Sequence, residues 1–157
     1  MSIFPTKILL ATDGSEEATL AAQTAVDIAD KTNSELHVVH VGGLDYGYHT
    51  SDDPSYAVPD YVYMQQIQEN LEQEARKALD AEVERVKAAG GRVVEAHLSM
   101  GSPDAEIVKL ADDIGAGLIV IGSRGLGGIR RALIGSVSDS VVRHAHCPVL
   151  GVREEKV

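Results

Sequence analysis

The feature that most constrains the fold of this chain is the alternation of five short apolar runs with four helical patterns. The runs are rich in β-branched residues or leucine, and they lie at Lys7–Thr12, Glu35–Val41, Arg92–Leu98, Leu118–Ile121 and Pro148–Val152. At least three of them are almost continuously apolar, which is typical of parallel strands buried on both faces. Arg92–Leu98 is more mixed, and this favours a place nearer an edge of the sheet.

Helical patterns fill the intervals between these runs. They cover Ser15–Lys31, a stripe from Met64 to Val86 that stops at Gly90-Gly91, a helix from Ser102-Pro103-Asp104 to about Ile114, and Ser136–His144. Strict β-α alternation predicts right-handed crossovers and helices on both faces. We therefore predict an α/β fold: one domain over residues 1–157, with an open, doubly wound, five-stranded parallel sheet of the Rossmann-like kind.

Composition places the chain among ordinary globular proteins. Its 157 residues include one cysteine, Cys147, and no apolar run approaches the roughly 20 residues that span a bilayer. The segment before Lys7 lacks a basic region followed by an apolar stretch, so no signal peptide is expected. We expect a cytoplasmic protein that contacts no membrane.

The charge is unevenly distributed along the chain. The net charge of −10 argues against binding to nucleic acid, whose phosphates would be repelled. Residues 1–121 carry 8 Lys and Arg against 21 Asp and Glu, whereas residues 122–157 carry 6 against 3. The basic C-terminal part fits a small anion better than a polyanion.

A glycine-rich stretch opens that basic part. In doubly wound sheets ligands bind at the carboxyl ends of the strands, and residues 122–140 follow the fourth run with five glycines. The stretch does not match a Walker-type phosphate loop, because Gly128 stands where that motif requires lysine. It does not match the dinucleotide-binding motif either, because Arg130 stands where that motif requires its last glycine. The spacing that does occur is Gly122-x2-Gly125-x9-Gly135-Ser136.

This spacing leads from a strand into a helix, where backbone N–H groups and the helix N-terminus favour a phosphate. Two interpretations of this stretch stay open, a phosphate-binding loop and a simple connection. In the second, Ser136-x-x-Asp139 is a capping box that needs no ligand, and the glycines only allow the chain to turn. Glu16 and Glu17 would repel phosphate at the first helix, so phosphates are expected at Ser136.

Three motifs together resemble the universal stress protein family. They are Ala11-Thr-Asp13-Gly-Ser15, the G-x2-G-x9-G-[ST] spacing, and His144-Ala-His-Cys-Pro148-Val-Leu near the C-terminus. The resemblance extends from about Phe4 to Arg153. The complete glycine spacing is similar to the ATP-binding branch, which implies ATP, with or without Mg²⁺, as the ligand.

The resemblance implies a set of site residues. Asp13 would lie near the ribose, the backbone of Val41 would meet the adenine edge, and the phosphates would lie among the glycines and serines. The candidate residues are Ala11, Thr12, Asp13, Val41, Gly122, Arg124, Gly125, Gly135, Ser136, Val137 and Ser138. Asp13 also suits a helix start, and Arg124, Arg130 and Arg131 suit either phosphate or solvent.

Neither a metal site nor a catalytic residue is predicted. His37 and His40 lie three apart on a strand and so face opposite ways, and His144 and His146 fall at a helix end. No second carboxylate is expected beside Asp13 to hold a metal. The tyrosines between Tyr46 and Tyr63 suit a loop packed on the domain, a lid or a partner contact.

Together with these observations, the resemblance implies a dimeric regulatory protein of the universal stress type that senses or holds ATP or a related adenine nucleotide, with little or no hydrolysis. The resemblance implies a homodimer paired through Pro148–Val152, whose edge would otherwise stay exposed. An ATP-independent interaction scaffold with a vestigial pocket and an unidentified protein partner, or a slow ATPase, are the alternatives.

Overall fold

The computed structural model describes residues 2–13, 16–43, 61–122 and 135–153. These residues form β1 (Lys7–Thr12), α1 (Glu16–Thr32), β2 (Glu35–Gly42), α2 (Tyr61–Ala88), β3 (Val93–Met100), α3 (Pro103–Ile114), β4 (Leu118–Gly122), α4 (Ser136–His144) and β5 (Val149–Val152). The order of strands and helices confirms the predicted alternation.

All five strands belong to one parallel sheet with the order β3-β2-β1-β4-β5. The chain proceeds from β1 through β2 to β3 on one side, and then returns to add β4 and β5 on the other. The predicted doubly wound α/β fold is therefore confirmed, and the mixed strand β3 lies at an edge, as its composition indicates. The strand order reverses between β1 and β4.

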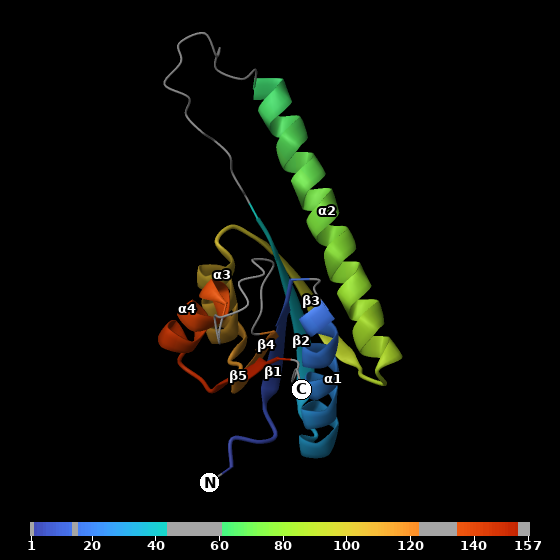
Figure 1. The fold of residues 1–157 in the computed structure, drawn as a ribbon, viewed down its shortest axis with the longest axis vertical. Coiled ribbons are helices and arrows are strands. Elements are labelled where there is room, and N and C mark those ends of the chain that lie inside the picture. Colours follow the sequence, from blue (N-terminus) through green and yellow to red (C-terminus); the bar gives the residue numbers. More distant parts are fainter. Residues whose placement is uncertain (1, 14–15, 44–60, 123–134, 154–157) are drawn as a thin grey trace.

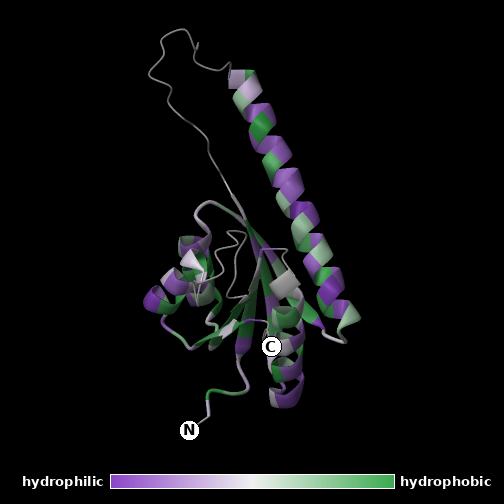
Figure 2. Cartoon of the chain, viewed as in Figure 1, coloured by the Kyte–Doolittle hydropathy of each residue, from purple (hydrophilic) through white to green (hydrophobic). Residues whose placement is uncertain are grey.

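Helices cover both faces of the sheet (Figure 1). Alternate side chains of each strand point to opposite faces, so that Ile8 and Leu10 pack under α1 and α2, whereas Leu9 and Ala11 pack under α3 and α4. Figure 2 shows the strands as the most continuously hydrophobic part of the chain. Burial on both faces explains why these runs lack polar alternation.

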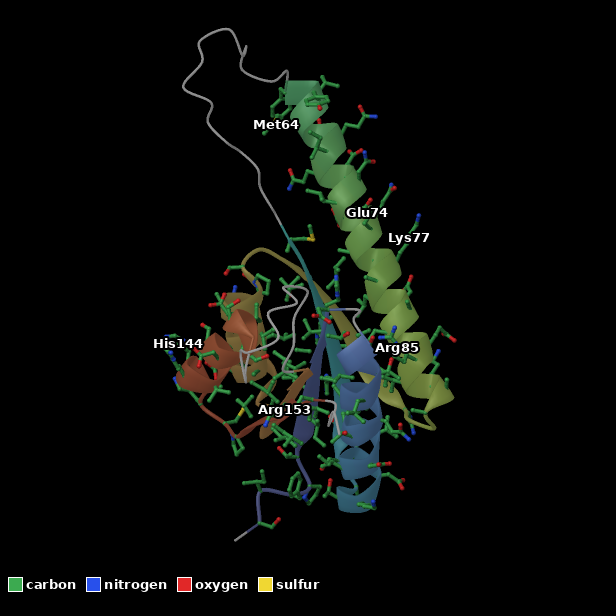
Figure 3. All side chains as sticks on the ribbon, in the orientation of Figure 1. Met64, Glu74, Lys77, Arg85, His144 and Arg153 are labelled. Carbon is green, nitrogen blue, oxygen red and sulfur yellow. The ribbon has the colours of Figure 1, made fainter. Side chains whose placement is uncertain are left out.

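Helix α2 is much longer than the sheet that it covers. Its 28 residues bury Ala75, Leu79, Glu82 and Val86, while Tyr61 at its start is 80% exposed. The first turns project beyond the domain, and Figure 3 shows Glu74 and Lys77 on the outer side of the helix. The predicted helical stripe is confirmed, but its first turns extend past the sheet, so their apolar side chains are only half-buried.

A glutamate is buried beside that stripe. Val83 of the stripe is half-buried and packs against the core, and the neighbouring Glu82 is buried completely. Within the described ranges, none of the helices is both long and apolar enough to cross a membrane.

Candidate functional site

The carboxyl ends of β1, β2 and β4 lie side by side at one edge of the sheet. Strand pairing aligns Ala11 with Val39 on one side and with Ile121 on the other, so the chain leaves all three strands in the same direction. Helices α1 and α4, which follow β1 and β4 in the chain, pack on opposite faces of the sheet. This is the position at which open α/β sheets bind ligands.

A side-chain hydrogen bond fixes the start of α4 to the end of β4. The hydroxyl of Ser138 donates to the carbonyl oxygen of Gly122 over 2.9 Å, and Ser138 is only 3% exposed. The bond joins two predicted site residues that are sixteen positions apart. It brings the first turn of α4 to the carboxyl end of the sheet, as the glycine spacing predicts.

The helix start differs in detail from the predicted capping box. Gly135 is the N-cap, with φ −62° and ψ 158°, and α4 begins at Ser136 without a side-chain hydrogen bond to its cap. The carboxylate of Asp139 instead pairs with Arg143 at 2.8 Å. The interpretation of Ser136-x-x-Asp139 as a capping box is therefore wrong, because both residues lie one position too far along the helix.

The remaining predicted residues differ in burial, and some of them lie outside the described residues. Ala11 is buried in β1, and Val137 of α4 packs against the core. Thr12, Asp13, Val41 and Gly122 are half-buried at the strand ends, and Ser136 is exposed. Arg124 and Gly125 lie outside the described residues, as do Arg130, Arg131 and most of the tyrosine-rich segment.

A buried carboxyl group that the sequence reasoning missed lies beside β1. Glu82 of α2 is 1% exposed, forms an ion pair with the guanidinium of Arg85, and hydrogen-bonds to Thr12. Figure 3 labels Arg85 on the part of α2 that lies against the domain. Glu82 could have been noticed in the sequence, because it lies at helical spacing between the buried Leu79 and Val86.

The electrostatics of Glu82 connect it to the predicted ribose residue. Burial raises the pKa of Glu82, Arg85 and the Thr12 hydrogen bond oppose the rise, and the negative charge of Asp13 adds to it. The charge of Asp13 thus acts on Glu82, whose own carboxylate pairs with Arg85. Glu82 Oε1 is buried without a hydrogen-bond partner among the residues that the structure describes.

A hydrogen-bond contact and a close approach of the backbone fix the ends of β1 and β2. The Nδ1 atom of His40 lies 3.2 Å from the carbonyl oxygen of Thr12. At Gly42 a Cβ atom would lie 2.6 Å from the Cβ of Ala75 and from the sulfur of Met100. Glycine is needed there because α2 and β3 approach the backbone closely, directly after Val41.

Fold and site together define a class of protein, the doubly wound α/β proteins, which bind ligands where the strand order reverses. The family model of universal stress proteins matches residues 5–153, so the chain belongs to the universal stress protein family. A Staphylococcus haemolyticus protein named a universal stress protein is 38% identical over 151 residues, which cover 96% of this chain and 86% of that protein.

Solved structures of the family share the fold. The universal stress protein UspA from Lactobacillus plantarum superposes with a TM-score of 0.76 at 29% identity, covering 97% of this chain and all of that one. A universal stress protein in complex with cAMP gives 0.67 at 26% identity, with 99% and 100% covered. The Archaeoglobus fulgidus universal stress protein in complex with dAMP gives 0.63 at 27%, with 96% and 99% covered.

Proposed function

We propose that this chain binds ATP or a related adenine nucleotide at the carboxyl ends of β1, β2 and β4, and acts as a regulatory nucleotide sensor. The observation that carries the proposal is the Ser138–Gly122 hydrogen bond of 2.9 Å, which holds the start of α4 at the end of β4. Relatives of the same fold that bind cAMP and dAMP support an adenine nucleotide as the ligand.

The phosphates belong at the start of α4. The first backbone N–H groups of a helix have no partners within the helix, and its N-terminus carries partial positive charge. Because Gly135 provides no side chain to cap α4, those donors stay available for an anion. Gly122 and Gly125 would complete the phosphate contacts, as the glycine spacing predicts, and Arg124 would balance the phosphate charge.

The ribose and adenine belong at the ends of β1 and β2. Asp13 suits the ribose hydroxyl groups, and the backbone of Val41 suits the adenine edge. The contacts of His40 with the Thr12 carbonyl oxygen and of Glu82 with Thr12 hold this end of β1 in place. We assign no catalytic residue, because Glu82 is committed to Arg85 and is too buried to act on a bound nucleotide.

Calorimetric titration of nucleotide-stripped protein with Mg-ATP tests the proposal. Gly135→Val should abolish binding while the chain stays folded, because φ −62° suits any residue and the added side chain would occupy the phosphate position. Ser138→Ala should weaken binding about fivefold, the effect of one lost hydrogen bond. Following ADP release in the same samples separates a sensor from a slow ATPase.

Ser140→Ala is the matched control in the same helix. It also removes a serine hydroxyl, but one that donates 2.7 Å to Asp104 of α3, away from β4. The proposal predicts that this variant binds ATP like the wild type. Equal affinity in the wild type, Gly135→Val and Ser138→Ala would contradict it, and the search would then move to a scaffold role with a protein partner.

We also propose a homodimer through the edge strand β5. The carbonyl of Pro148 accepts a hydrogen bond from the Ile119 N–H over 3.0 Å, so the backbone groups of Val149 and Gly151 point away from β4. Leu150 adds an apolar side chain that is 37% exposed. Such an edge suits pairing with a second copy, as the resemblance implies.

A further inference from the structure

Two histidines and two glutamates gather on one face of the sheet, far from the proposed nucleotide site. Glu35 and His37 are two apart on β2, Glu95 and His97 are two apart on β3, and the pairing places His37 opposite Glu95. Because alternate side chains share a face, all four point to the same side, which is the side of α3 and α4.

A β-bulge produces this arrangement. Leu36 pairs with Val93 but His37 pairs with Glu95, so Val94 is an extra residue in β3. Without the extra residue, His37 would stand opposite Val94, and the apolar Ala96 would take the diagonal position next to it. The bulge therefore brings the polar residues of β3 beside His37. Bulges often redirect side chains in this way near functional sites.

The distances between the ligand atoms match a tetrahedral zinc site. The Nδ1 of His37 lies 3.2 Å from the Nε2 of His97, and zinc–nitrogen bonds of about 2.0–2.1 Å put two ligands about 3.3 Å apart. The Oε2 of Glu95 is 3.8 Å from the His97 Nε2, and one ligand atom from each of the three residues lies within 4.8 Å of the others.

Burial divides the cluster into a rigid part and an adjustable part. The side chains of His37 and His97 are 5% and 14% exposed, whereas that of Glu95 is 63% exposed. The two imidazoles are thus held by packing, while the carboxylate can move the half ångström or so that a metal requires.

Glu35 supplies the support that metal-binding histidines usually have. Its Oε2 lies 3.4 Å from the Nε2 of His37, the ring nitrogen on the side away from His97. A proton held on Nε2 by this carboxylate leaves the lone pair on Nδ1, where the metal would bind. The charges of Glu35 and Glu95 together balance those of a divalent cation.

The geometry points to a zinc-binding site formed by His37, Glu95 and His97, with Glu35 orienting His37 and water in the fourth position. The site is separate from the nucleotide crevice, because His37 precedes Val41 by four residues, about 13 Å along the strand. His40, near the crevice, faces the other way and contacts Thr12. Bound zinc would tie the edge strand β3 to β2.

Zinc affinity of the metal-stripped full chain tests the site, measured by competition with a chromophoric chelator in the absence of ATP, which itself binds zinc. We expect one Zn²⁺ per chain and a raised melting temperature. His97→Gln should weaken binding at least about a hundredfold, and Glu35→Gln about tenfold. Glu95→Gln, at the exposed mouth, should weaken binding without affecting the fold, as circular dichroism would check.

The double variant His144→Gln/His146→Gln is the control. Both histidines are exposed, one at the end of α4 and one just beyond it, and Figure 3 labels His144 there. It should bind zinc like the wild type. No uptake with zinc in excess, wild-type affinity in both His97→Gln and Glu95→Gln, or loss of binding only in the control would each overturn the proposal.

Discussion

Replacing the buried carboxyl group of Glu82 by an amide should change how the stability of the fold depends on pH. Burial, the largest influence, raises the pKa of Glu82 above the ordinary 4.5, so the folded chain holds this proton more tightly than the unfolded chain does. The contribution of the Glu82 proton to the stability of the wild type is therefore lost as pH rises from about 4.5 through the raised pKa of the folded chain. Glu82→Gln has no proton to lose and avoids this loss.

The size of the effect follows from linkage. Below pH 4.5 both side chains are neutral and of equal size, so the wild type and Glu82→Gln should have nearly equal free energies of unfolding. Above the raised pKa the variant should be more stable by about 1.4 kcal/mol for each unit of the rise. Each kcal/mol corresponds to about 2–4 °C in melting temperature for a chain of this size.

Urea unfolding of both proteins between about pH 4 and pH 8 measures this difference directly. Glu84→Gln is the control, because Glu84 also pairs with a cation three residues on, Lys87 at 3.5 Å, but is 74% exposed. Exposed pairs contribute at most about 1 kcal/mol. If instead Glu82→Gln lost about 3–5 kcal/mol at neutral pH, the attraction of Arg85 would outweigh burial and our reasoning would be wrong.

Three further substitutions test other parts of the structure. Hydroxyls of Ser102 and Ser140 hydrogen-bond to Asp104 and hold its pKa below the usual 3.8, so Asp104→Asn should lower the melting temperature at neutral pH, and the difference should vanish as pH falls through the lowered value. Gly42→Ala should lower the free energy of unfolding in urea by about 1–3 kcal/mol, because its Cβ would meet Ala75 at 2.6 Å. Gly151→Pro, which removes an outward N–H of β5, should give a folded monomer by light scattering, and a dimer of unchanged stability would count against the β5 interface.

Most of the fold could be predicted from the sequence because its signals are local. The buried parallel strands read as apolar runs, and Ser102-Pro103 marks the start of α3, where the structure has Ser102 as N-cap and proline in the first turn. The range predicted for the last helix, Ser136–His144, is confirmed. Only its N-cap differs, because serine is a stronger capping signal in a sequence than the glycine before it, and the structure has Gly135 in that position.

Contacts between distant elements could not be predicted in the same way. The side-chain contact between His37 and His97 depends on the bulge at Val94, which shifts the register of β3 by one residue and leaves no signal in either run. The approach of Glu82 to Thr12 depends on how α2 packs across β2. The family resemblance implied that Gly122 and Ser138 belong to one site, although it did not predict the bond between them.

The central claim is that an adenine nucleotide binds where α4 begins beside β4. Backbone amide chemical shifts of the ¹⁵N-labelled chain, followed during titration with Mg-ATP, test it most directly. The account predicts saturable shifts at the amides of Gly135–Ser138 and Gly122, with smaller ones at Asp13 and Val41. Shifts confined to β5 or to the outer turns of α2, or none at saturating ATP, would contradict it.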